Sequence, residues 1–498
     1  MSRLERRIVS ILSVGEKVRL LISSALLLLS LCHSACTSAQ ELQGPISTAD
    51  IPGATQPFKL TLVRTIDLAK TNYPEIKAAI LHQQAAEAGI QKAKTAYLPK
   101  GSMLVEELRA TSNNITGPLF PQMTIPQITG AVNGGNDLTG GWLSGAGVLI
   151  SWEPFDFGLR AAQVHAARAQ TEQAIAQLAV TQLDVQSAAA DAFLRVLHAQ
   201  QVLKAAQAKL QRMKTFAETV HVLAQKDLHA ATDEYLAEAE VAKARDEVTE
   251  SEQSLDLSSI ALSKSIGLAN ASLVLDGEAL LAQVTTPEPV FGNPFNHPVV
   301  LAQRAAVTVA EARRRVIAKT YYPQFNLLGA LYGRGSGFNT DVSINQSRGY
   351  YPTKFNYAVG VAITLPFLDI FQLRAEQRIA TKHESEEKSR LDLAVLNIET
   401  QSAQAQALLK AAQKIAANAP IKVKAASEAA RSTEIRYRYG LASVNDVALN
   451  EQLLTQSQVD YATAQLRVWR ALLAVAVANG DLQPFRTLVA RAGLPGRQ

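Results

Sequence analysis

A mixed α and β fold, with very long helices, four strands and two tandem structural repeats, is predicted by three features of the sequence. No glycine or proline occurs between Gly158 and Gly267, and only two such residues interrupt 367–479. Most of the glycines and aromatic residues gather in two segments, 97–160 and 321–371. Related motifs also recur in the two halves. Since glycine and proline end helices, such long uninterrupted runs predict helices far longer than the usual three turns.

The N-terminal segment has the pattern of a secretory signal. The apolar run Leu20–Leu31 follows five basic residues and precedes small ones. It is too short to cross a membrane as a helix, which takes about 20 residues. We therefore expect residues 1–39 to form a signal peptide and 40–57 an N-terminal linker. Without the signal peptide the net charge falls from +5 to +2, so the charge balance gives no support for a nucleic-acid partner.

Both cysteines of the chain, one of them Cys36, lie in this leader. Cleavage near Ala39 would remove every thiol and, with it, disulfides, thiol catalysis and cysteine metal sites. The alternative is lipidation of Cys36, as in a lipoprotein. Ser34 and Ala35 fit the usual lipoprotein signal, whereas His33 departs from it.

An internal repeat organises the rest of the chain. In the second half, Leu228, Asp233 and Gly267 recur at a constant offset as Leu441, Asp446 and Gly480. We expect repeat 1 to cover 58–283, with strands at about 101–111 and 143–153. Repeat 2 is expected to cover 284–483, with strands at about 324–334 and 356–365, followed by a C-terminal tail over 484–498.

Within each repeat we expect a helix, two strands joined by a long loop, a very long helix, a tight turn and a shorter helix. The very long helices are predicted at 159–224 and 373–438, about 100 Å each at 1.5 Å per residue. The tight turns then fall at 225–231 and 439–444. Pro420 lies inside the second long helix, so we expect a kink or local break there.

The strands have the pattern of a barrel wall. From Tyr357 to Leu365, large apolar residues alternate with small ones, which suits a strand with one face toward lipid. A bilayer tolerates no unpaired strand edge, and four strands cannot close a barrel. Copies of the chain must then share one barrel: two copies would give eight strands and a filled interior, three would give twelve and a lumen. Aromatic residues are expected at both ends of the strands, as in the interfacial girdles of a membrane barrel; they are Trp142, Trp152, Phe155, Tyr321, Tyr350, Tyr351 and Phe355. The alternative is a soluble β-subdomain with these aromatic residues in its core.

Four motifs carry a resemblance to a known family: Asn72-Tyr73-Pro74-Glu75, Tyr97-Leu98-Pro99, His297-Pro298 and the run Tyr437-Arg438-Tyr439-Gly440-Leu441-Ala442-Ser443-Val444-Asn445-Asp446-Val447. With them the chain resembles the TolC-like outer-membrane efflux proteins, the outer-membrane factor family. The resemblance implies a trimeric twelve-stranded outer-membrane β-barrel, four strands per chain, continued by a long α-helical periplasmic tunnel. It also implies the outer membrane of a Gram-negative bacterium, contact with its lipid, and two partners, a periplasmic adaptor (membrane fusion) protein and an inner-membrane pump.

The same resemblance implies an aperture that closes at the helical turns. Asp446 matches an acidic ring there, and Leu449 stands where the family has a second acid. Tyr437, Thr232 and Asp233 match three residues of the links that hold the closed state, and the fourth, an arginine, is replaced by Ala442. The alternative for Asp233 and Asp446 is a helix N-terminal charge that complements the helix dipole.

The turns are also expected to dock the adaptor. The residues that match the family's docking pattern, or occupy the equivalent first turn, are Leu228, Ala230, Gly440, Leu441, Ala442 and Ser443. The alternative is that these residues only cap helices.

No catalytic constellation, phosphate loop or metal-ligand spacing is present in the sequence, so we expect no enzyme, cofactor or metal site. The expected function is the outer-membrane channel-tunnel of a tripartite efflux system. Such a channel is a passive exit duct for drugs or other small molecules pumped from the inner membrane or periplasm. Two alternatives remain: the outer-membrane duct of a type I protein secretion system, and an envelope-anchored structural coiled-coil protein.

Overall fold

The computed structural model describes residues 58–111, 138–226, 230–268, 273–281, 292–339, 343–365 and 367–492. The expected signal peptide, Cys36, the linker 40–57 and Leu228 lie outside these residues. The first half contains β1 (Phe58–Leu60), α2 (Leu62–Asn72), α3 (Pro74–Thr95), β2 (Lys100–Thr111), β3 (Gly140–Phe155), α4 (Leu159–Gln225), α5 (Ala231–Ser265) and β4 (Leu273–Leu275). The second contains α6 (Pro298–Lys319), β5 (Gln324–Ser336), α7 (Gln346–Gly349), β6 (Lys354–Thr364), α8 (Ile370–Arg438), α9 (Val444–Ala478) and α10 (Gln483–Ala492).

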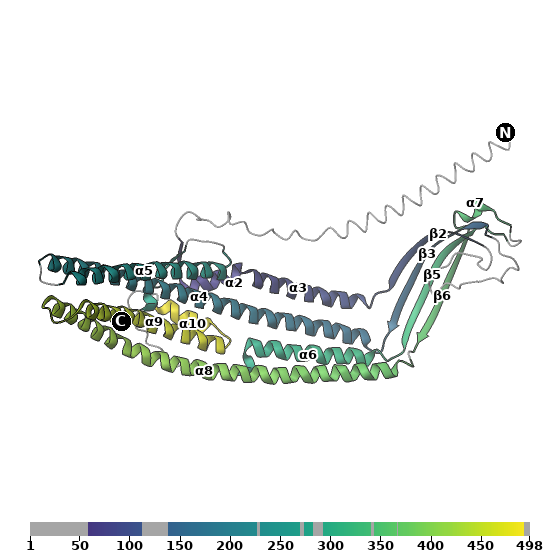
Figure 1. Ribbon diagram of the computed structural model, residues 1–498. Coiled ribbons are helices and arrows are strands. Elements are labelled where there is room, and N and C mark those ends of the chain that lie inside the picture. The colour runs from purple at the N-terminus through teal and green to yellow at the C-terminus, as the bar shows by residue number, and fades with distance from the viewer. Residues whose placement is uncertain are drawn as a thin grey trace, which may run out of the picture. The chain divides into compact units, whose positions relative to one another are not determined.

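The order of elements repeats (Figure 1): α3, β2, β3, α4 and α5 are followed by α6, β5, β6, α8 and α9. Equivalent helices have nearly equal lengths, with 22 residues in α3 and α6, 35 in α5 and α9, and 67 and 69 in α4 and α8. Each long helix begins and ends within three residues of its predicted bounds, and so does each of the four strands. The two tandem repeats predicted from the sequence are therefore present in the fold.

Four glycines with left-handed backbone mark the ends of the long helices. Gly158 precedes α4 with φ +89°, and Gly267, Gly440 and Gly480 follow α5, α8 and α9 with φ between +72° and +74°. After α8, the N–H of Gly440 donates to Tyr437 O at 2.9 Å and the next N–H donates back to Arg436 O. These two bonds satisfy carbonyls that the helix end leaves without partners. Such a glycine ends α5, α8 and α9, whereas α4 ends at Gln225 without one.

Of the kink or local break predicted near Pro420, the local break is wrong, while the kink stays a prediction. α8 continues through Pro420 without interruption. Proline removes one backbone hydrogen bond of the helix. Pro420 is exposed, while the neighbouring Ala416 and Ala419 are buried. α8 packs along α9, and this packing preserves the helix despite the missing bond.

The four long strands form one antiparallel sheet in the order β2-β3-β5-β6. The register aligns Met103, Val148, Leu331 and Tyr357 in one row across the sheet, and all four side chains are exposed. Rows on the opposite face contain smaller residues such as Gly147 and Ala330. The sheet thus has one large apolar face that the described chain does not cover, and β2 and β6 form its edges within the described residues.

Aromatic residues lie at both ends of this sheet. At one end the rings of Trp142 and Tyr350 are 5.4 Å apart. At the other, the ring of Phe157 stacks on that of Tyr322 at 5.2 Å, and Trp152 Nε1 donates to Tyr97 O at 3.0 Å. This placement agrees with the predicted position of the aromatics at the strand ends.

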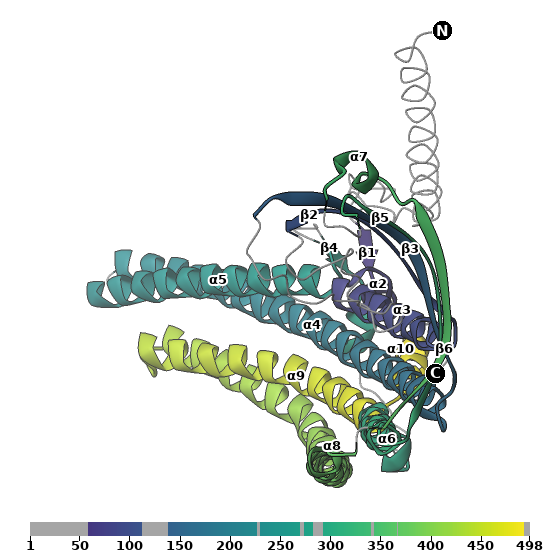
Figure 2. The ribbon, with the colours of Figure 1, turned by 90° about the vertical axis from the view of Figure 1, so that its right-hand side faces the viewer.

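The helices form two antiparallel pairs, α4 with α5 and α8 with α9, as Figure 2 shows. We call them hairpin 1 and hairpin 2. Contacts between α4 and α9 join the two hairpins, and α4 also packs on α3 and α6. Among the described residues, no helix combines the length and the apolar composition that a membrane crossing needs.

The glycine endings give a stability prediction. At Gly480, alanine would adopt a left-handed backbone, which costs about 1–2 kcal/mol, and its Cβ would also overlap the ring of Pro298. At Gly158, alanine meets the same backbone cost with nothing within 4 Å of its Cβ. We expect Gly480→Ala to lower the thermal unfolding temperature, followed by circular dichroism, clearly more than Gly158→Ala does. Equal shifts would contradict the packing at Gly480.

Candidate functional site

The turn between α8 and α9 is built by its own sequence. Gly440 follows α8 in a left-handed conformation, and Ser443 is the N-cap of α9. Ser443 Oγ accepts a hydrogen bond from Asp446 N at 3.2 Å, and Asp446 Oδ2 accepts one from Ser443 N at 2.8 Å. This reciprocal pair is a capping box, which satisfies two backbone N–H groups at the start of the helix. The turn is therefore fixed by local hydrogen bonds.

The carboxylate of Asp446 is exposed, and its surroundings favour the ionised form. Hydrogen bonds from the backbone and side chain of Ser443 lower the pKa of Asp446 below its usual value, and the nearby charge of Arg436 lowers it further. The structure thus shows the helix-capping role that was the alternative for Asp446. A capping carboxylate still carries its charge, so a role in an acidic ring stays a prediction.

Tyr437 and Asp233 meet across the two hairpins. The Tyr437 hydroxyl donates to Asp233 Oδ2 at 3.2 Å, and the Tyr437 side chain is fully buried. Burial and the neighbouring charge of Asp233 raise the pKa of the Tyr437 hydroxyl, so it stays a neutral donor at all physiological pH values. Thr232 lies beside Asp233 at the start of α5 and is exposed. The structure therefore brings together two of the three residues expected in the closed-state links.

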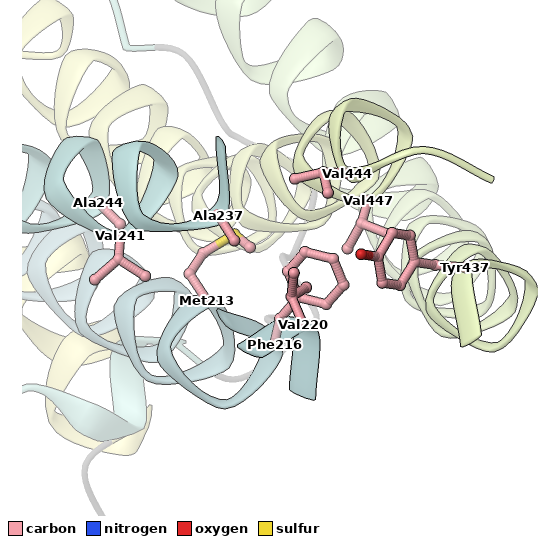
Figure 3. Packing of buried hydrophobic residues seen from close by; sticks show 9 residues of the cluster. All are labelled: Met213, Phe216, Val220, Ala237, Val241, Ala244, Tyr437, Val444 and Val447. Atoms are coloured by element: carbon pink, nitrogen blue, oxygen red, sulfur yellow. The ribbon is translucent and has the colours of Figure 1, made fainter. Parts of the chain in front are cut away.

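A shared apolar core surrounds this contact (Figure 3). The Phe216 and Tyr437 rings lie edge to face with centroids 5.0 Å apart. The core, which we call the tip cluster, consists of Met213, Phe216, Val220, Ala237, Val241 and Ala244 from hairpin 1 and Tyr437, Val444 and Val447 from hairpin 2. Burying one valine, phenylalanine or methionine side chain of this cluster contributes about 1.5–3 kcal/mol to stability. The two hairpins are consequently held together at their turns mainly by apolar burial.

The remaining residues of the turns present an exposed surface. Leu441 is 67% exposed and Leu449 is 69% exposed, whereas Ala442 packs partly against the tip cluster. Ala230 is the N-cap of α5 and is exposed, and a Cβ added at Gly440 would meet nothing within 4 Å. These residues are placed where a partner could reach them, and the docking role stays a prediction. The described residues contain no cluster of three or more metal-ligating side chains.

Two polar residues that the sequence analysis did not identify also join the hairpins. Lys209 Nζ lies 2.7 Å from both carboxylate oxygens of Glu247 on α5 and bonds Gln452 on α9. Arg212 Nε donates to Glu451 Oε2 on α9 at 2.6 Å. The one sequence signal was the position of Lys209, on the same helix face as buried residues three or four positions away. Their partners depend on how α4 aligns with α9, which the sequence does not reveal.

Comparison with known proteins agrees with this arrangement. The family model described as outer membrane efflux protein matches residues 65–268 and 295–481, more than three quarters of the chain. No curated protein sequence matches the chain.

Solved structures match over most of their length. The outer membrane protein VceC from Vibrio cholerae shares 18% identity, with 84% of this chain and 96% of that chain covered and a TM-score of 0.67. The CmeC outer membrane channel of Campylobacter jejuni shares 16% identity, with 84% and 85% covered and a TM-score of 0.66. The MtrE outer membrane channel of Neisseria gonorrhoeae, in its open state, shares 18% identity, with 84% and 89% covered and a TM-score of 0.63.

At this identity the structural likeness establishes the fold, and the family match establishes the relationship. The chain therefore belongs to the outer membrane efflux protein family, a family of outer-membrane channels with periplasmic helical tunnels and not of enzymes.

Proposed function

We propose that the chain is the outer-membrane exit duct of a tripartite efflux system and passes drugs or other small molecules that a pump delivers. The observation that carries this proposal is the continuity of α4 and α8. Each leads directly from a strand of the sheet with the exposed apolar face to a turn at the tip cluster. At 1.5 Å per residue, 67 residues of helix place the turn about 100 Å from the sheet. A lipid-facing sheet and a distant closable end are the two parts that such a duct needs.

The sheet supports a shared barrel. Within the described residues β2 and β6 are its edges, and the strands alternate in direction from β2 to β6. With four strands per chain, β6 of one copy can pair antiparallel with β2 of the next, and the alternation continues around the ring. Three copies give twelve strands, enough for a lumen. The exposed apolar row through Val148 and Leu331 would face lipid, a feature for which an envelope-anchored coiled coil has no use.

The turns would form the gate and the docking surface. In a homotrimer six turns converge, so Asp446, Tyr437, Thr232 and Asp233 would lie near the aperture. The turn residues expected to dock the periplasmic adaptor, which links the duct to the inner-membrane pump, are Leu228, Ala230, Gly440, Leu441, Ala442 and Ser443. The partly buried hydrogen bond between Tyr437 and Asp233 supports this proposal, because it joins two hairpins that must separate if the aperture widens.

The assembly can be tested directly. We expect chemical cross-linking of the protein in outer membranes to give trimers, and unheated samples to migrate as trimers in gels while boiled samples migrate as monomers. The reason is that each open strand edge in the bilayer must be paired by another copy. Exclusive recovery of monomers, or a barrel of two subunits, would contradict the proposal.

The charge of Asp446 gives a second prediction. Carboxylates converging on one axis attract cations and slow anions, so Asp446→Asn should reduce cation selectivity in planar-bilayer recordings while the trimer persists. Because the pKa of Asp446 is lowered from its usual 3.8, the wild-type selectivity should persist as the pH falls toward that value and disappear only below it. The capping contribution of this carboxylate follows the same direction, present near neutral pH and lost as pH falls through the lowered pKa.

The control for this experiment is Glu434→Gln, which removes an acid that is paired with Arg438 on the same exposed turn of α8. It should leave selectivity near that of the wild type. Unchanged selectivity in Asp446→Asn would mean that Asp446 serves only as a cap.

A further inference from the structure

The surface between α4 and α9 follows a regular antiparallel register. Asp191 pairs with Arg470 at 3.0 Å, His198 lies 3.2 Å from the hydroxyl of Thr463, and Lys209 bonds Gln452. As the residue number rises along α4 toward its turn, the number of the partner residue on α9 falls by the same amount. These contacts are polar, and they belong to two different hairpins. We call this surface the α4–α9 seam.

The polar contacts of the seam that lie nearest the turns come immediately before the tip cluster. Lys209 and Arg212 precede Met213, the first member of that cluster on α4. On α9, Glu451 and Gln452 lie one turn beyond Val447. The polar contacts therefore border the tip cluster on one side, while the hydrogen bond between Tyr437 and Asp233 borders it at the turns.

The two cations are held differently. The Lys209 side chain is only 2% exposed and its charge is neutralised within hairpin 1 by Glu247, so its bond to Gln452 is the part that crosses the seam. Arg212 crosses the seam with its charge, since it bonds the Glu451 carboxylate, which is 12% exposed, and Thr455 Oγ1 at 3.2 Å. Hydrogen bonds between ionised groups are stronger than neutral ones, and partial burial reduces their screening by water.

We propose that Lys209, Arg212, Glu451 and Gln452 form a gating clamp, a second link that keeps the aperture closed independently of the contact between Tyr437 and Asp233. This inference rests on the proposed channel function. Separation of the hairpins at the tip cluster moves α9 away from α4. The clamp opposes that motion because Arg212 and Glu451 would exchange a partly buried ion pair for separate hydration. Lys209 holds the register between α4 and α9, because its charge is neutralised by Glu247 and its bond to Gln452 fixes the position of α9.

The test is single-channel conductance of the purified protein in planar bilayers, without any adaptor. Arg212→Gln and Glu451→Gln each remove the ion pair, and the combination Arg212→Glu with Glu451→Arg restores it in reverse. We expect each single variant to shift the open-to-closed ratio toward open by about tenfold or more, the effect of losing one charged hydrogen bond. The reversed pair should return toward the wild-type ratio. Arg438→Gln is the control, since Arg438 pairs only with Glu434 on its own helix in the contacts shown.

Migration as a heat-sensitive trimer identifies the variants that are correctly assembled. Wild-type ratios in both single variants, alongside opening by Tyr437→Phe, would overturn the clamp while leaving the channel function intact. Opening by both single variants without recovery in the reversed pair would also overturn it, because the two residues would then act separately. Failure of the wild type and of Tyr437→Phe to form any channel would contradict the proposed function itself and, with it, the clamp.

Discussion

A backbone amide or carbonyl in hydrocarbon must be hydrogen-bonded, and this constraint decides whether the sheet of this chain can lie in a membrane. The sheet satisfies it between its strands but not at β2 and β6, its edges within the described residues. One face has an exposed row of large apolar residues, from Met103 to Tyr357. A sheet of this kind is stable in a bilayer only if other copies pair with its edges. The proposed trimer follows from this requirement together with the alternating strand directions.

The helical part depends on the polar contacts between the two hairpins and on the apolar packing at their turns. Two hairpins of nearly equal length meet along the α4–α9 seam, where polar contacts succeed one another until the apolar tip cluster begins. Such a seam gives a defined register, because the partners of its polar groups on α9 lie at fixed positions. The hairpins can therefore separate near the turns while the ion pair between Asp191 and Arg470, which lies farther from the turns, stays intact. A closable end can thus be built from helices that are continuous with a rigid sheet.

The sequence predicts much of this fold because its breakers are few. The positive-φ glycines, Gly158, Gly267, Gly440 and Gly480, mark the helix ends in the structure, and alternating residues mark the strands. The local break predicted at Pro420 is absent, because α8 packs along α9 and stays helical despite one missing hydrogen bond. The clamp could not be predicted, because the partners of Arg212 depend on the register between two helices far apart in sequence. For Asp446 the sequence allowed both a cap and a gate residue, and the structure displays the cap.

The proposed assembly is tested most directly by a high-resolution electron cryo-microscopy structure of the protein extracted from outer membranes. We expect three copies in which β6 of each pairs antiparallel with β2 of the next, so that no strand edge faces the detergent, and the row from Met103 to Tyr357 faces outward. A structure in which β2 or β6 remains unpaired, or in which that apolar row lines the interior, would contradict the assembly.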